Sequence, residues 1–348
     1  MSNATKAKPF HGKCILITGG TGSLGRAVVR RLLSGEMGRP AKIIVFSRDE
    51  GKHHQMKMDF KHMAVATDDI FYHNFEESLD FRVGDVRDYH AVLRAVREAD
   101  AIIHAAALKQ VPSCEYFPAE AVLTNVVGAQ NIATVIREHA LKVEVAVAIS
   151  TDKACKPINV MGMTKAIQER IFVEANLGNP QTRFLCVRYG NVVASRGSVV
   201  PLFAEQIRTG GPVTITIPEM TRFLITLDSA VDTVFAAIRQ GRAGDTFVPR
   251  LPSATVENIA RVMIGSRSIK MEIIGIRPGE KIHEIMVSEE EAYRTEEVGQ
   301  YYTIRPMLPE VAGKPVKKPA LTKEYSSEGS TVSREETAEI LRRAGYLT

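Results

Sequence analysis

The residues Lys13-Cys14-Ile15-Leu16-Ile17-Thr18 are followed at once by Gly19-Gly20-Thr21-Gly22-Ser23-Leu24-Gly25. The first six are mostly apolar and predict a short buried strand, and Ala27 to Leu33 continue at helical spacing. A strand, a glycine turn and a helix place the helix amino terminus where a pyrophosphate can bind. The alternative is a purely structural glycine turn. We favour a dinucleotide site made by Gly19, Thr21, Gly22, Ser23, Leu24 and Gly25.

The next predicted strands, 42–46, 80–83 and 101–104, supply the rest of this site at their carboxyl ends. Ser47 and Arg48 follow the first of them and suit the 2′-phosphate of NADP, while Asp49 leaves NAD as the alternative. An Asp at the next strand end can bind the adenine amino group, and small residues after the third let a flat cofactor lie against the backbone. The cofactor residues predicted here are Ser47, Arg48, Asp85, Val86, Ala105, Ala106, Ala107, Lys109 and Lys165.

Two more apolar runs, 143–149 and 183–188, bring the alternation of strands and helices to six strands. This pattern predicts an α/β fold with a doubly wound parallel sheet. A helix over 228–240, capped by Asp228, and a strand over 246–249 extend it. We therefore expect a dinucleotide-binding domain from residues 10–189 plus 227–249, and a smaller carboxyl-terminal substrate-binding lobe from 190–226 plus 250–348.

The fifth strand ends in Ser150-Thr151-Asp152-Lys153-Ala154, and a helix begins near Met161. Met161 and Lys165 are four residues apart and so share one helix face. If they are desolvated, a neighbouring Asp and Lys can act as an acid and a base. The alternative for the bare dipeptide is a solvated ion pair at a strand end.

The composition indicates a cytoplasmic protein without nucleic-acid or membrane partners. The 348 residues carry a net charge of only +5, and no basic cluster with interleaved aromatic residues occurs. The four cysteines are scattered, which favours free thiols in a reducing cytosol, and the histidines lack metal-ligand spacing. No stretch is long and apolar enough to span a bilayer.

The motifs together resemble the extended short-chain dehydrogenase/reductase superfamily, whose dinucleotide domain is Rossmann-like. They are most similar to inverting UDP-N-acetylglucosamine 4,6-dehydratases of bacterial capsule and surface-glycan pathways. The stretches that carry this resemblance span almost the whole chain: 18–25, 46–50, 84–88, 104–115, 150–154, 188–201, 220–223 and 277–281. Met161 stands where the superfamily has its catalytic Tyr, and Lys165 is kept, as in the Met-bearing branch of these dehydratases. A thioether cannot accept a proton from a sugar hydroxyl.

The resemblance implies NADP-dependent removal of water from UDP-N-acetylglucosamine, with inversion at C5. It assigns Lys153 as the C5 base, Asp152 as the acid for the departing hydroxyl and Thr151 or Ser150 as a hydrogen-bond donor to the C4 oxygen. Lys165 would hold the nicotinamide ribose, and the acceptor of the C4 hydroxyl proton stays open. The implied substrate-binding residues are Lys109, Asn191, Arg196, Val200, Arg222, Arg277 and Glu280.

Two alternatives stay open at this point. The first is a nucleotide-sugar 4-epimerase or a retaining dehydratase. The second is a non-catalytic NADP-binding sensor whose base was lost at Met161. Relatives also imply a homo-oligomer, such as a ring or hexamer.

Overall fold

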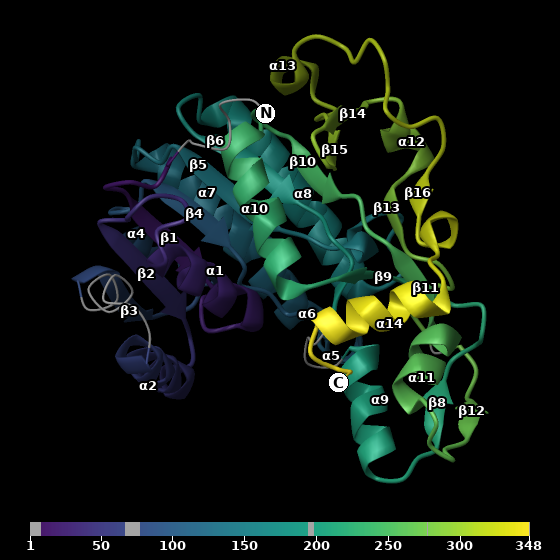
Figure 1. The fold of residues 1–348 in the computed structure, drawn as a ribbon. Coiled ribbons are helices and arrows are strands. Elements are labelled where there is room, and N and C mark those ends of the chain that lie inside the picture. The colour runs from purple at the N-terminus through teal and green to yellow at the C-terminus, as the bar shows by residue number, and fades with distance from the viewer. Residues whose placement is uncertain (1–7, 67–76, 194–197, 277, 348) are drawn as a thin grey trace.

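The computed structural model describes residues 8–66, 77–193, 198–276 and 278–347. The strands of its main sheet are β1 (Cys14–Thr18), β2 (Lys42–Ser47), β3 (Leu79–Val83), β4 (Ala101–His104), β5 (Val145–Ile149), β6 (Arg183–Val187), β10 (Thr246–Pro249), β14 (Thr295–Val298) and β15 (Tyr301–Ile304). Their order is β14-β15-β10-β6-β5-β4-β1-β2-β3 (Figure 1). The pairs from β3 to β10 are parallel, and β15 and β14 are added antiparallel at the edge. The predicted Rossmann-like, doubly wound α/β fold is confirmed.

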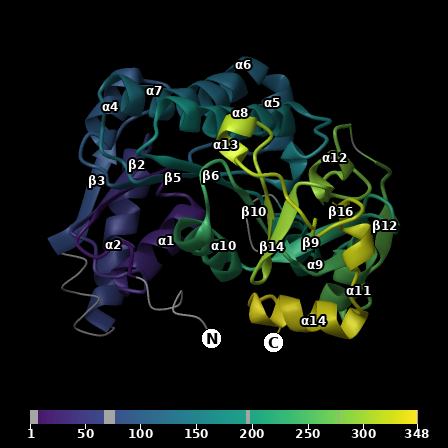
Figure 2. The same ribbon diagram turned by 90° about the horizontal axis from the view of Figure 1, so that it is seen from above.

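Helices cover both faces of this sheet, as Figure 2 shows. One face shares an apolar core with α1 (Ser23–Leu33), α2 (Glu50–Ala66) and α10 (Leu227–Gln240). The other shares a core with α4 (Tyr89–Val96), α7 (Gly128–Glu138) and α8 (Val160–Gly178). Because a strand covered on both sides has no polar face, the central strands read as apolar runs in the sequence.

A separate apolar core lies among elements from the second half of the chain. Its helices are α9 (Val199–Arg208), α11 (Val256–Ile264) and α14 (Arg334–Arg343), and its two-stranded sheet pairs β8 (Val213–Ile215) with β12 (Met271–Ile273). Beside it, β9 (Thr221–Ile225) pairs with β7 (Asn191–Val192) and β11 (Ser253–Thr255), and β13 (Ile285–Val287) pairs with β16 (Tyr325–Ser326). β14 and β15 come from the range that we placed in the smaller lobe, yet they extend the main sheet. The division into two lobes otherwise stays a prediction.

Short helices complete the described chain. They are α5 (Val111–Tyr116), α6 (Pro118–Ala121), the π-helix η2 (Val122–Val127), the 3₁₀ turns η3 (Asp152–Ala154) and η4 (Glu328–Ser330), α12 (Glu289–Ala292) and α13 (Pro309–Ala312). Within the ranges that the structure describes, no helix has the length and apolar character needed to cross a membrane.

The cap of α10 differs from the prediction. Thr226 is the N-cap residue, and its hydroxyl accepts a hydrogen bond from the Ser229 backbone. Asp228 lies in the first turn and pairs with Arg30 of α1 at 2.9 Å. The prediction of an Asp228 cap was wrong, because a threonine two residues earlier already satisfies the free amide.

Candidate active site

A continuous cavity of about 1140 Å³ runs along the carboxyl ends of the central strands. Its walls include the first residues after β1, β2, β4 and β5, namely Gly19, Arg48, Ala105 and Ser150. Open α/β sheets bind ligands at this edge, where the strand order reverses between β1 and β4. All fifteen residues predicted to bind the cofactor line this one cavity.

The glycine turn has the geometry that a pyrophosphate needs. Gly19 adopts a φ of +66°, and a Cβ there would lie 2.7 Å from the Ala106 backbone nitrogen. A Cβ on Gly25 would lie 2.5 Å from the Gly20 backbone, so only glycine lets α1 start this close to the turn. Helix α1 has neither a side-chain cap nor an acidic residue in its first turn. Its amino terminus is therefore able to bind an anion.

The rim beyond β2 carries charges of both signs, and Lys52 pairs with Asp49 at 2.7 Å. Arg48 and Lys52 both line the cavity, and Arg48 lies 3.8 Å from Asp85, which itself binds Arg87. Ser47 is less available than predicted, because its hydroxyl bonds the Thr21 hydroxyl at 3.0 Å and the His53 ring at 2.6 Å. The arrangement fits an adenosine ribose or its 2′-phosphate beside Arg48.

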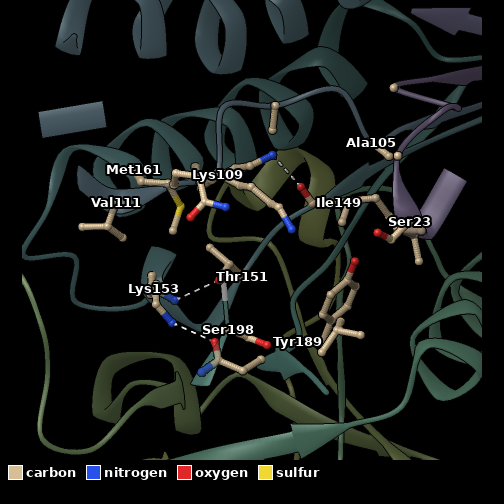
Figure 3. Close-up of a pocket in the computed structure, with 18 of the residues that line it drawn as sticks. Ser23, Ala105, Lys109, Val111, Ile149, Thr151, Lys153, Met161, Tyr189 and Ser198 are labelled. Carbon is tan, nitrogen blue, oxygen red and sulfur yellow. Dashed lines mark hydrogen bonds between the residues drawn. The ribbon is translucent and has the colours of Figure 1, made fainter. Parts of the chain in front are cut away.

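Lys165 and Met161 lie on the wall formed by α8, as their spacing predicted. Lys165 donates to the Ile149 carbonyl at 2.8 Å and to Gln168 at 2.9 Å. Burial lowers the pKa of Lys165 to about 8. Met161 packs against Cys114 and Ala121, and Figure 3 shows it across the cavity from Lys153 and Tyr189. The position of the usual phenol thus holds a buried thioether.

Lys153 lies on the other side of the cavity from Met161 (Figure 3). Its ammonium is 3.1 Å from Asp152 Oδ1, 3.2 Å from Asn191 Oδ1 and 2.9 Å from Glu284 Oε1. Burial by itself would lower the pKa of Lys153, but Asp152 and Glu284 outweigh it and raise that pKa. The structure therefore holds Lys153 as an ammonium, anchored between two carboxyl groups.

Asp152 is fully buried behind Lys153 and is not among the residues of the cavity wall. Burial raises the pKa of Asp152, and the charge of Lys153 opposes this. Thr151, which does line the cavity, donates its hydroxyl to Asp152 Oδ1 at 2.8 Å. Ser150 also lines it but donates to Glu169 at 2.5 Å. A raised pKa suits an acid, and Thr151 connects Asp152 to the cavity.

The predicted substrate residues divide into three groups. Lys109, Asn191, Arg222 and Glu280 line the cavity. Val200 does not, because it is buried in the apolar core of α9 and α11. Arg196 and Arg277 lie outside the described residues.

Several wall residues were missed by the sequence analysis. Glu284 is the most consequential, since it is 1% exposed and contacts Lys153. Lys281 and Tyr189 also line the cavity. Lys281 ends the charged stretch 277–281 and Tyr189 follows the predicted sixth strand directly, so the positions of these two residues carried a usable signal, whereas that of Glu284 did not.

Comparison with known proteins gives the family. A model of the family described as "Polysaccharide biosynthesis protein" matches residues 15–306. The chain belongs to this polysaccharide biosynthesis protein family. It is 44% identical over 302 residues to a "UDP-N-acetylglucosamine 4,6-dehydratase (inverting)" of Campylobacter jejuni, covering 86% of this chain and 84% of that one.

Two further relatives align with nearly the full length of the chain. A Rickettsia typhi protein named "UDP-glucose 4-epimerase" is 41% identical and covers 97% of this chain and 98% of its own. Pen from Bacillus thuringiensis, whose X-ray structure is known, is 32% identical in sequence. The two structures match with a TM-score of 0.86 over 97% of this chain and 100% of Pen. The family and its short-chain dehydrogenase/reductase-like fold are therefore shown, while the relatives' names divide between a dehydratase and an epimerase.

Among the described residues, no three His, Cys, Asp or Glu side chains are grouped so that they could hold a metal ion. The four cysteines are free thiols, as predicted.

Proposed function

We propose that this protein is a 4,6-dehydratase that converts UDP-N-acetylglucosamine to a UDP-2-acetamido-2,6-dideoxy-4-hexulose, with inversion at C5, for bacterial surface-glycan synthesis. The observation that supports it most is Lys153. Its ammonium lies in the cavity wall between two buried carboxyl groups, across from a methionine that replaces the usual phenol. A reaction that moves protons at adjacent carbons needs both an acid and a base at one place.

The residues present fit a nicotinamide dinucleotide, and we propose NADP. The uncapped amino terminus of α1 would bind the pyrophosphate, and Arg48 with Lys52 would bind the 2′-phosphate. Lys165 would hold the nicotinamide ribose, and Ala105 to Ala107 would lie against the ring system. When bound, the cofactor accepts a hydride from C4 of the hexose and returns it to C6.

Lys153 and Asp152 perform the proton transfers in this proposal. Once C4 is a ketone, the proton on C5 is acidic, and the Lys153 amine removes it. Asp152 passes a proton to the Thr151 hydroxyl as that hydroxyl passes its own proton to the departing C6 hydroxyl. For this step the Thr151 hydroxyl, which donates to Asp152 Oδ1 in the structure, turns toward the cavity that Thr151 lines. Thr151 rather than Ser150 is then the hydroxyl available near the C4 oxygen, because Ser150 is bonded to Glu169.

The uridine diphosphate would be bound by the wall beyond Lys153. Arg222 and Glu280 line it, together with Lys109 and Asn191. An Arg guanidinium matches the geometry of a phosphate, so Arg222 is the proposed diphosphate ligand. The homo-oligomeric state and the cytoplasmic location implied by the resemblance stay predictions, and light scattering of the purified protein measures the first.

The second candidate is a 4-epimerase, which the name of the Rickettsia relatives favours. Met161 argues against it, because an ordinary epimerase needs a phenol at that position. A non-catalytic sensor is the third candidate, and a sensor would have no need for the carboxyl–amine cluster at Lys153.

One incubation separates these candidates. The protein, NADP and UDP-N-acetylglucosamine in D₂O are followed by proton NMR. A dehydratase gives a C6 methyl signal, a C4 ketone and deuterium at C5. An epimerase gives a C4-epimeric sugar without a new methyl signal, and a sensor gives neither product nor exchange, so either result overturns the proposal.

A further inference from the structure

Glu284 reaches the reaction site from a distant part of the sequence. It lies directly before β13, and its backbone amide donates to the Ser327 hydroxyl at 2.9 Å. One carboxylate oxygen, Oε1, is 2.9 Å from the Lys153 ammonium. The other, Oε2, is buried and has no hydrogen-bond partner among the residues that the structure describes. Glu284 Oε2 therefore keeps unused acceptor capacity.

The segment that carries Glu284 is fixed against the Lys153 loop. The Gly279 carbonyl accepts from Asn159 at 2.9 Å, and Lys281 donates to the Cys155 carbonyl at 2.5 Å. The Ile282 carbonyl accepts from the Thr221 amide at 3.0 Å. These contacts fix the position of the Glu284 carboxylate relative to Lys153. The side chains of Glu284 and Lys153 both line the cavity.

Lys153 must change its protonation state before it can remove a proton from C5. A C5 base must be an uncharged amine, but two carboxyl groups hold Lys153 as an ammonium. Its proton must leave before Lys153 can act. Release to water is unfavourable at a site that a bound sugar would close to solvent. The nearest acceptor that is already hydrogen-bonded to Lys153 on the cavity side is Glu284.

We propose that Glu284 is a positioning residue that takes the Lys153 proton and so converts this lysine to the active base; this rests on the proposed function. The Lys153 N–H bond breaks, an O–H bond forms on Glu284, and the ion pair becomes two neutral groups. The freed nitrogen pair then takes the C5 proton, and the C–H electrons pass toward the C4 ketone. Desolvation by the substrate favours the neutral pair over the ion pair.

The charged groups that the structure describes around Glu284 and Lys153 determine which of the two holds the proton. Glu284 faces Lys153, Arg222 of β9 at 3.8 Å and Lys281. Lys153 faces Asp152 as well. Burial would raise the pKa of Glu284, but Lys153 and Arg222 outweigh it and lower that pKa. Glu284 is therefore a carboxylate at neutral pH, able to accept a proton.

The test is the pH profile of kcat for Glu284→Gln. In the unchanged enzyme the proton passes from Lys153 to Glu284. The fall of kcat at low pH, the acid limb of the profile, then reports the protonation of Glu284, whose pKa is lowered. Glutamine keeps a hydrogen-bond acceptor but cannot take the proton, and Lys153 must then lose it to solvent. We expect kcat at neutral pH to fall about 100-fold and to rise with pH at unit slope, so that the acid limb moves up by several units.

Two variants separate proton transfer from packing. Glu284→Asp keeps the carboxylate and should return the acid limb to its original position at a lower maximum. Asp245→Asn removes a different buried carboxylate, paired with Arg305 and absent from the cavity wall, so it should lower stability without moving the limb. A uniform loss of kcat in Glu284→Gln, with the limb unmoved, overturns the proposal.

A readout without turnover distinguishes failure of this proposal from failure of the proposed function. The acetylation rate of Lys153 by acetic anhydride, followed by mass spectrometry, reports its pKa in the resting protein. Removing the Glu284 charge should shift half-maximal labelling to lower pH. If labelling shifts but the unchanged protein has no dehydratase activity, only the proposed function fails. If the protein is an active dehydratase and neither labelling nor the acid limb shifts, only the role of Glu284 fails.

Discussion

The two halves of the cavity are built in different ways. The cofactor half is local: Gly19 to Gly25 form one turn between β1 and α1, and backbone atoms set its shape. The reaction half is not local, because Lys153 at the end of β5 meets Glu284, which lies just before β13. The cofactor half therefore depends on glycines, which have no side chains. The reaction half depends on charged side chains that only the complete fold brings together.

This difference determines how each half should respond to substitution. At the glycine turn an added carbon displaces backbone, so the damage is steric and falls on binding. At Lys153 a removed charge leaves two buried carboxyl groups facing each other, so the damage is chemical and falls on turnover. Binding and turnover should thus separate along the cavity.

The largest effect is expected for Lys153→Ala. Loss of the C5 base should lower kcat about 10³-fold or more, while the dissociation constant of NADP stays within about threefold. Product formation by proton NMR and cofactor binding by fluorescence measure the two quantities. Lys156→Ala is the matched control, since Lys156 is on the same loop but pairs with Glu324 at 2.8 Å outside the cavity. Full turnover in Lys153→Ala would remove this lysine from the mechanism.

The next effect is expected for Gly25→Ala. The new Cβ would lie 2.5 Å from the Gly20 backbone, which cannot move without shifting the phosphate-binding amides. Overpacking of this kind costs about 1–3 kcal/mol, which corresponds to roughly a 5- to 150-fold weaker NADP affinity. Titration of the purified variant with NADP measures it.

Gly51→Ala provides the control for that substitution. Gly51 is exposed in the first turn of α2, and its nearest neighbour to a new Cβ is Asp49 Oδ1 at 3.4 Å. Alanine there should leave NADP binding unchanged and raise helix stability slightly. Equal affinity losses in both variants would contradict the steric explanation.

The fold was predictable because its determinants lie close together in the sequence. Short, mostly apolar stretches and the turns after them identified the parallel strands of the main sheet, although β3 also holds Asp80 and Arg82 and the parallel pairs β7–β9 and β8–β12 were not predicted. The antiparallel strands β14 and β15 were assigned elsewhere, because Thr295–Val298 and Tyr301–Ile304 carry acidic and polar residues that look like a surface hairpin. These two strands join the sheet at its edge, where a strand can keep one polar face and therefore need not be apolar throughout.

The reaction site was predictable only in part. Lys153 and Met161 were found from motifs at strand and helix ends, and both line the cavity. Asp152 was expected at the same wall but is buried behind Lys153, because both residues lie in the 3₁₀ turn η3, where successive side chains point in different directions. Glu284 was missed, since nothing in a single sequence indicates which distant carboxylate will contact a given lysine.

The smallest effect concerns the outer rim of the cofactor half, where charge rather than backbone geometry is expected to act. Arg48→Ala should weaken NADP about tenfold and leave NAD almost unchanged, because only NADP has a phosphate at this position. The loss is moderate because the Arg48 side chain is 52% exposed and water screens its charge. Arg39→Ala is the matched control, as Arg39 is also 52% exposed but does not line the cavity. If the loss for NADP shrinks as salt is added while Arg39→Ala stays neutral, the rim selects the cofactor by charge; equal losses for NADP and NAD would instead assign Arg48 to the shared part of the two cofactors.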